Sequence, residues 1–312
     1  MINWWGLIIS LLTFIAGLHI MSSGLKIAAG QRLKGFLKLL TINPLLGVIT
    51  GALVTVILQS SSFTTVMVVG LVNTGLLNLN QGISIMVGAN IGTTITGQIL
   101  SFSFIEWVLP VTICGIVILL ISRYRFKELR GFGAALVGVG MLFGGLHGMS
   151  DALKSLRESI LIINLLIQAG ETPVKGILMG AFSTLILQSS GAVIGIIMAL
   201  ALQGILTLSA SIAIILGADM GTCITSMVAS LGTNIHARRA ALAHLIFNII
   251  GAICLLLIYN SFLQLVLTTS SQLPRQIANA HTLYNVFNSL IILPFINQFT
   301  RLVIYLLPDE KN

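Results

Sequence analysis

The sequence Gln59-Ser60-Ser61-Ser62 lies inside a largely apolar run, Leu53–Val72, and a near copy, Gln188-Ser189-Ser190-Gly191, lies inside a second run, Phe182–Leu202. Lipid cannot hydrogen-bond a carboxamide or a row of hydroxyls, so such groups must face protein or a water-filled cavity. One cluster of this kind is explained by helix packing, because Ser and Thr are common where membrane helices touch. Two copies in matching settings instead indicate two halves of one polar site inside a membrane protein.

The composition supports this class. Hydrophobic residues make up 56% of the chain and charged residues only 8%, whereas soluble domains carry about a quarter charged residues. A chain of 312 residues is long enough for roughly eight to ten membrane segments of about 20 residues. The net charge of +8 comes from basic residues in short loops, as in membrane proteins generally, so we do not expect nucleic-acid binding. The three cysteines show neither a disulfide framework nor metal-ligand spacing.

The chain repeats itself at an offset of 128 to 129 residues. Gly17–Lys26 matches Gly145–Lys154 at seven of ten positions, and Pro44–Ser62 matches Pro173–Gly191 at ten of nineteen. A third pair, Gly88–Gly97 and Gly217–Ser226, is identical at six of ten positions. Chance gives about one or two matches per ten in an apolar chain, so the matches indicate an internal duplication. A smaller echo relates Ala241–Asn248 to Ala278–Asn285.

The pattern of apolar runs predicts an all-α membrane protein of two repeats, 1–130 and 131–312, the second with additional C-terminal helices. Each repeat is expected to contain a re-entrant hairpin, at about 46–73 and about 175–203. Each is also expected to contain a transmembrane helix broken at its Gly-Ala-Asn/Asp-x-Gly-Thr sequence, because glycine and asparagine in mid-segment favour exposed backbone. Further helices are expected at Trp4–Leu25, 107–122, 238–259 and 277–306, the last with a bend at Pro294. The start of the chain is expected to be the first helix and not a signal peptide. Amphipathic segments on the membrane surface are expected at Lys26–Asn43 and about 152–170.

The distribution of lysine and arginine predicts the topology. If both Gln-Ser-Ser segments return to the side from which they enter, each repeat crosses the membrane three times and the repeats are inverted. The loops 26–43, 123–130 and 230–239 and the C-terminus then share one side with 12 of the 16 Lys and Arg, compared with an 11 to 5 split if both segments cross. The positive-inside rule favours the hairpins. We therefore expect a multi-pass protein of the plasma (inner) membrane with its N-terminus outside and its C-terminus in the cytoplasm.

The expected site is neutral and rich in hydroxyls. Hydroxyls and helix N-termini donate to anions, whereas carboxamide oxygens and unwound carbonyls coordinate Na⁺. The candidate substrate-binding residues are Gln59, Ser60, Ser61, Ser62, Gln188, Ser189, Ser190 and Asn90. The candidate sodium-binding residues are Gly88, Asn90, Thr93, Thr94, Thr96, Gly217, Asp219, Thr222 and Thr225. A site without arginine suits an oxyanion that must bind and leave again, with cations supplying the compensating charge.

Asp219 is the one acidic residue deep in an apolar run, and its repeat mate is the neutral Asn90. A carboxylate inside the membrane is costly and is a functional hypothesis by default. Two readings stay open for Asp219: coupling to an ion or a proton, and accepting hydrogen bonds from helix-end amides. The recurring His19, His147, His244 and His281 are attributed to symmetric packing, and Asn248 and Asn285 to hydrogen bonds between helices.

The paired Gln-Ser-Ser segments, each followed about 28 residues later by Gly-Ala-Asn/Asp-x-Gly-Thr, resemble the sodium/phosphate cotransporter family, the bacterial relatives of the animal type II transporters. The resemblance covers nearly the whole chain. It implies symport of inorganic phosphate with Na⁺ by alternating access and no other cofactor. It also implies re-entrant hairpins from opposite faces, with the Gln-Ser-Ser tips and the glycine-broken helices forming the phosphate and sodium sites. Two departures concern coupling: the second tip lacks one hydroxyl at Gly191, and Asp219 replaces an expected asparagine.

Other classes of function fit less well. An enzyme with Ser60 or Ser189 as nucleophile needs an activating base within reach, and no histidine lies in either hairpin segment. A passive channel or a structural bundle is disfavoured because hairpins from two sides gate alternately. The alternative that stays open is Na⁺- or H⁺-coupled transport of another small anion. The sequence does not decide between a monomer and a homo-oligomer.

Overall fold

The computed structural model describes residues 3–29, 43–102, 105–122, 126–154 and 160–309, and every regular element in these ranges is helical. The helices are α1 (Trp4–Ala29), α3 (Pro44–Leu58), α4 (Ser61–Asn73), α5 (Leu79–Leu100), α6 (Ile105–Ser122), α7 (Lys127–Ala152), α8 (Ile160–Glu171), α9 (Pro173–Leu187), α10 (Ser190–Leu202), α11 (Leu208–Ala229), α12 (Ile235–Leu257), α13 (Tyr259–Leu267), α14 (Leu273–Ile292), the 3₁₀ turn η3 (Leu293–Phe295) and α15 (Ile296–Leu306). The predicted all-α class is confirmed.

In the described part of the chain, six helical segments are long and apolar enough to cross a membrane: α1, α5, α7, α11, α12 and the run from α14 to α15. The predicted bend at Pro294 is confirmed, because η3 interrupts that last run. The short helix α13 was not predicted. Of the two predicted amphipathic segments, residues 30–42 and 155–159 lie outside the described residues.

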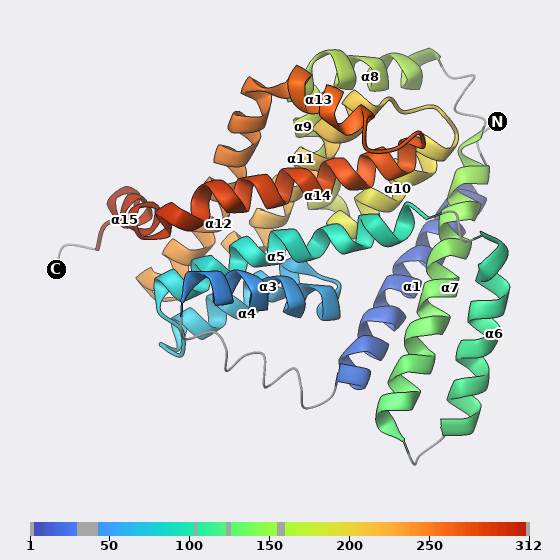
Figure 1. The fold of residues 1–312 in the computed structure, drawn as a ribbon, viewed down its shortest axis with the longest axis horizontal. Helices are drawn as coiled ribbons and strands as arrows, with labels where there is room; N and C mark the ends of the chain where they lie inside the picture. The colour runs from blue at the N-terminus through green and yellow to red at the C-terminus, as the bar shows by residue number, and fades with distance from the viewer. Residues whose placement is uncertain (1–2, 30–42, 103–104, 123–125, 155–159, 310–312) are drawn as a thin grey trace.

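Helices α1, α6 and α7 stand side by side as one group, and the other membrane helices lie on one side of it (Figure 1). Within this group α1 and α7 are antiparallel and their glycines meet the opposite backbone. Gly17 faces the backbone of Gly138 and Leu142, and its repeat mate Gly145 faces the backbone of Ser10 and Phe14. Any side chain at these glycines would collide with the partner helix, so the small residues set the close approach.

Glycines also allow close backbone contact between α3 and α5 and between α9 and α11. A Cβ atom at Gly88 would strike the carbonyl oxygen of Val48, and one at Gly217 would strike the carbonyl oxygen of Ile177. These contacts correct one prediction. Helices α5 and α11 run without interruption through the glycine-containing sequences, so the expected broken helices are wrong. The glycines there permit backbone-to-backbone packing, which requires no break in the helix.

The Gln-Ser-Ser segments are where the chain does break. Helix α3 ends at Leu58 and α4 begins at Ser61, while α9 ends at Leu187 and α10 begins at Ser190. The Oγ1 atoms of Thr55 and Thr64 are 3.0 Å apart, although nine residues of continuous helix would separate them by roughly 13 Å. The chain therefore folds back between α3 and α4, and we call each such unit a helix pair.

Candidate functional site

The tips of the two helix pairs share one backbone geometry. Gln59 and Gln188 both have φ of 50°, and they are the two non-glycine residues with positive φ in the described part of the chain. A left-handed residue ends each first helix, a position at which glycine is usual. Ser60 and Ser189 then act as N-caps, accepting from Phe63 N at 3.1 Å and Ala192 N at 3.2 Å. Each capping hydroxyl accepts through oxygen and keeps its proton available for a ligand.

The first tip is held against α5. Thr96 Oγ1 donates to Gln59 Oε1 at 2.9 Å, and Ser61 Oγ lies 3.5 Å from Thr93 Oγ1. The side chains of Gln59 and Ser60 are half-buried, and those of Ser61, Thr93 and Thr96 are buried. The structure thus brings together five of the residues predicted from the sequence.

The second tip is not held in the corresponding way. Gln188 is exposed, and Thr225, the repeat mate of Thr96, donates instead to the carbonyl oxygen of Thr222 on its own helix. Thr222 likewise donates to the carbonyl of Asp219. Among the described residues no hydrogen bond joins Gln188 to Thr225. The two tips therefore have the same backbone but different surroundings.

The two tips approach each other at Thr96. A Cβ atom at Gly191 would lie 3.8 Å from Thr96 Cγ2 and 3.7 Å from Ser189 Oγ, while the hydroxyl of Thr96 bonds Gln59. Thr96 thus contacts the first tip and faces the second. This convergence of residues from both halves of the chain is the geometric basis of the candidate site.

A first polar cluster surrounds Asn90, at the middle of α5. Asn90 Nδ2 donates to Asn248 Oδ1 at 2.9 Å, and Asn90 Oδ1 lies 3.2 Å from His244 Nε2. The other ring nitrogen, His244 Nδ1, lies 3.3 Å from Ser226 Oγ. All four side chains are buried.

A second polar cluster surrounds Asp219, the repeat mate of Asn90, on α11. His281 Nε2 lies 3.2 Å from both carboxylate oxygens of Asp219, and Asn285 Nδ2 donates to Asp219 Oδ2 at 2.9 Å. Asp219, His281 and Asn285 are 3%, 1% and 0% exposed. His281 and Asn285 hold the places in α14 that His244 and Asn248 hold in α12.

The interhelical role predicted for Asn248 and Asn285 is therefore confirmed. The histidines were attributed to symmetric packing in preference to substrate contact, and His244 and His281 in fact contact two predicted site residues directly. The sequence marked these residues without their partners, since the repeat between 241–248 and 278–285 contains both the histidine and the asparagine. The remaining predicted residues are not gathered at these clusters: Thr94 donates to Ile91 O, and Ser62 is half-buried.

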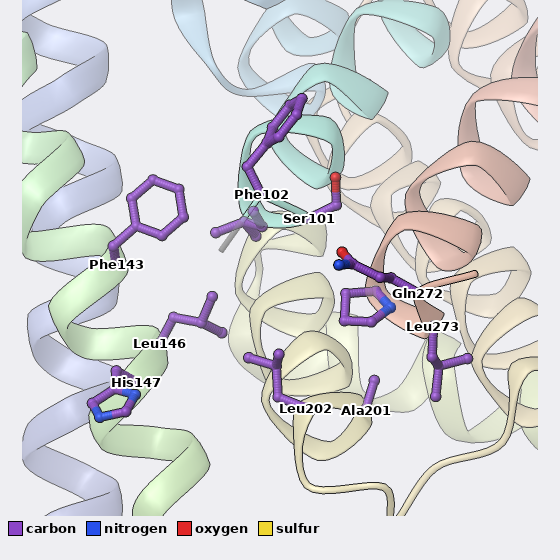
Figure 2. Close-up of a pocket in the computed structure, with 11 residues that line it drawn as sticks. Ser101, Phe102, Phe143, Leu146, His147, Ala201, Leu202, Gln272 and Leu273 are labelled. Atoms are coloured by element: carbon purple, nitrogen blue, oxygen red, sulfur yellow. The ribbon is translucent and has the colours of Figure 1, made fainter. Parts of the chain in front are cut away.

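A cavity of about 470 Å³ opens between α7, α5, α10 and the start of α14. Figure 2 shows its walls, with Phe143, Leu146, Leu202 and Leu273 around the space and the polar Ser101, His147 and Gln272 at intervals. Next to it Arg275 donates to Ser101 Oγ at 2.9 Å and lies over the ring of Phe102. None of the substrate-binding or sodium-binding residues predicted from the sequence lines this cavity, so it is separate from the tips.

The fold, with helices long and apolar enough to cross a membrane, is that of a polytopic membrane protein, and its paired polar tips form a candidate site. The family model described as Na+/Pi-cotransporter matches residues 13–151 and 149–273. The chain therefore belongs to this family, which is one of phosphate transporters and not of enzymes.

Individual relatives differ in how much of them the chain covers. The uncharacterized protein YqeW of Bacillus subtilis is 32% identical over 243 residues, which are 77% of this chain and 78% of YqeW. YjbB of Salmonella typhimurium, provisionally named an inorganic phosphate export protein, is 27% identical over 77% of this chain and 44% of its own length. The human sodium-dependent phosphate transport protein 2B is 43% identical over 90 residues, 28% of this chain and 13% of that protein. No solved structure matches the chain.

Proposed function

We propose that the chain is a secondary active transporter that moves inorganic phosphate together with Na⁺ by alternating access. The observation that carries the proposal is the duplicated tip. Gln59 and Gln188 share an unusual backbone conformation, Ser60 and Ser189 cap the helices that follow, and both tips approach Thr96. Two helix N-termini with free hydroxyl protons, in a family of phosphate transporters, suit a phosphate oxyanion.

The proposed architecture is two inverted repeats, 1–130 and 131–312, with α3–α4 and α9–α10 as re-entrant hairpins from opposite faces. The antiparallel packing of α1 on its repeat mate α7 supports inversion, because a twofold axis across both helices reverses one relative to the other. Inverted repeats with discontinuous segments meeting at the midplane are common in secondary transporters.

The connections between loops support the proposed orientation. Asn234 bonds Asn73 twice, and Arg239 bonds the carbonyl of Leu307; all four residues lie where the charge count puts the cytoplasm. Arg275 bonds Ser101 near the opposite ends of the helices. We therefore propose that the N-terminus lies outside the cell and the C-terminus in the cytoplasm.

The inequivalent tips support alternating access. Gln59 is bonded to α5 and Gln188 is exposed, which is the difference expected when one half of a symmetric site is closed and the other is open. In this proposal the phosphate-binding residues are Gln59, Ser60, Ser61, Ser62, Gln188, Ser189, Ser190 and Asn90. The Na⁺-binding region is formed by Thr93, Thr94, Thr96, Asp219, Thr222 and Thr225, and Gly88 and Gly217 contribute through the packing that positions α5 and α11.

Purified protein in liposomes tests the substrate and the direction together. Radiolabelled phosphate flux is measured into and out of vesicles, with sulfate and a small carboxylate as competitors. The proposal predicts phosphate flux that unlabelled phosphate suppresses and that equal concentrations of the competitors do not. Stronger suppression by a competitor would replace phosphate with another small anion. Comparison of the two directions decides between uptake, as proposed here, and the export for which YjbB is named.

A further inference from the structure

The clusters around Asn90 and Asp219 occupy equivalent positions, but their hydrogen bonding is not equally complete. In the Asn90 cluster each carboxamide and imidazole atom has a partner. Asn90 bonds Asn248 and lies beside His244, while Asn248 Nδ2 reaches both Cys223 Sγ and the carbonyl of His244. Ser226 contacts the remaining His244 nitrogen. This cluster is neutral and its side-chain atoms are paired with one another, so no atom in it calls for a cation.

The Asp219 cluster is incomplete in two places. Asn285 Oδ1 and His281 Nδ1 are buried and have no hydrogen-bond partner among the residues that the structure describes. The second gap has a visible cause. Gly97 occupies the repeat position of Ser226, and its Cβ position would lie 3.8 Å from His281 Nδ1, so the hydroxyl that completes the first cluster is missing here. Buried polar atoms without partners are rare and each requires an explanation.

The Asp219 cluster also contains a buried carboxyl group, and its ionisable neighbour is a histidine. Among the described residues, the one ion-pair partner of Asp219 is His281. An ionised carboxylate only accepts hydrogen bonds, so Nε2 must carry the proton that lies between it and Asp219. A neutral His281 leaves one negative charge 3% exposed within helices that cross the membrane. A buried charge without a counter-ion is strongly unfavourable.

We propose that Asp219 and Asn285 bind one monovalent cation, with Na⁺ as the cation tested, and that the Asn90–His244–Asn248 cluster is its closed counterpart without a cation. The Asp219 carboxylate supplies the charge, and the amide oxygen of Asn285 supplies a neutral oxygen ligand. His281 is a positioning residue, since its Nε2 holds both carboxylate oxygens. The sequence duplication thus yields one cation site and not two. The coupling of this cation to transport rests on the proposed function, whereas its binding does not.

Direct Na⁺ binding to the purified protein tests the inference. Binding of ²²Na⁺ and the thermal unfolding midpoint are measured without phosphate, with choline chloride keeping the ionic strength constant. The wild-type protein should bind Na⁺ saturably, and Na⁺ should raise its thermal unfolding midpoint. Asp219→Asn should lose both effects. Asn285→Ala should weaken Na⁺ binding by about 10-fold or more, the range usual for removing a group that holds a metal site.

Two further variants serve as controls. Asn248→Ala removes the equivalent amide from the other cluster and should leave Na⁺ binding unchanged, even if the protein is less stable. Gly97→Ser adds a partner for His281 Nδ1 in space that accepts a Cβ, and it should also retain Na⁺ binding. If Asp219→Asn does not fold, the comparison of Asn285→Ala with Asn248→Ala still decides.

The inference is overturned if the wild type binds no Na⁺, if Asp219→Asn or Asn285→Ala binds it as the wild type does, or if Asn248→Ala weakens binding as much as Asn285→Ala. These outcomes are distinct from failure of the proposed function. A wild type that binds Na⁺ at Asp219 but moves no phosphate would sink the proposed function alone. If the protein transports phosphate and the substitutions at Asp219 and Asn285 do not change its Na⁺ binding, this inference alone would be rejected.

Discussion

Thr96 Oγ1 donates a hydrogen bond of 2.9 Å to Gln59 Oε1. This bond joins the first tip to α5, and the same hydroxyl-bearing side chain faces Gly191 of the second tip. Its repeat mate Thr225 makes no such bond and donates to Thr222 O within α11. A duplicated sequence has therefore produced two tips in different environments, and this difference can be measured.

Thr96→Val should destabilise the first tip, because it removes the donor and leaves Gln59 Oε1 without that partner. We expect a loss of about 1 kcal/mol in the free energy of unfolding, measured by thermal unfolding in detergent. Thr225→Val is the matched control, since its hydroxyl bonds only its own helix, and it should change stability less. Equal losses in the two variants would show that the bond between Thr96 and Gln59 is not specific to the first tip.

Gly88→Ala and Gly217→Ala should each reduce the yield of folded protein severely. The added methyl would overlap a carbonyl oxygen of α3 or α9, and forced overpacking costs about 1–3 kcal/mol or more. Gly70→Ala is the control, because no described residue lies within 4 Å of its Cβ position. The measurement is the monodisperse fraction in size-exclusion chromatography. Normal yields for Gly88→Ala would mean that α3 and α5 are not in backbone contact.

The capping serines should have two separable roles. Ser60→Ala and Ser189→Ala remove an N-cap, at a cost of about 1 kcal/mol in stability, together with the proposed phosphate contact. Ser60→Asn and Ser189→Asn retain a capping side chain but lack the hydroxyl. We expect the asparagine variants to unfold at temperatures near that of the wild type while their phosphate transport falls. Full transport by both asparagine variants would remove the serine hydroxyls from the phosphate site.

Arg239 should stabilise the C-terminal end of the described chain. Its side chain is 2% exposed and donates to Leu307 O at 2.9 Å and to Asp309 at 3.0 Å. Arg239→Gln should therefore accelerate proteolysis after α15, which limited proteolysis with mass spectrometry would detect. Asp309→Asn should have a smaller effect, because Asp309 is largely exposed and the bond to Leu307 remains. Unchanged cleavage in Arg239→Gln would contradict this anchoring.

Much of the arrangement could be predicted because it depends on local rules. The polar Gln-Ser-Ser sequences inside apolar runs predicted where the chain breaks, and the structure breaks at those residues. Pro294 predicted a bend, since proline cannot donate to the helix ladder. The glycines of α5 and α11 were wrongly interpreted as helix breaks, because glycine occurs both where helices break and where two helices pack closely. The sequence of a helix does not show which helix packs against it.

The partners of Asn90 and Asp219 required the fold. His244 lies 154 residues from Asn90, and His281 lies 62 residues from Asp219, so no local spacing relates them. The echo between α12 and α14 identified the right residues but did not show which helix each would face. The different surroundings of Gln59 and Gln188 could not be predicted either, because the two tips are nearly identical in sequence.

We propose that a Na⁺ gradient drives phosphate movement, and concentrative uptake is the direct test. Proteoliposomes containing the purified protein receive labelled phosphate with an inward Na⁺ gradient, or with choline in place of Na⁺. We expect phosphate to accumulate above its external concentration only with the Na⁺ gradient, and the accumulated phosphate to leave when an ionophore dissipates that gradient. Equal phosphate uptake in Na⁺ and in choline, or uptake that never exceeds equilibrium, would contradict it.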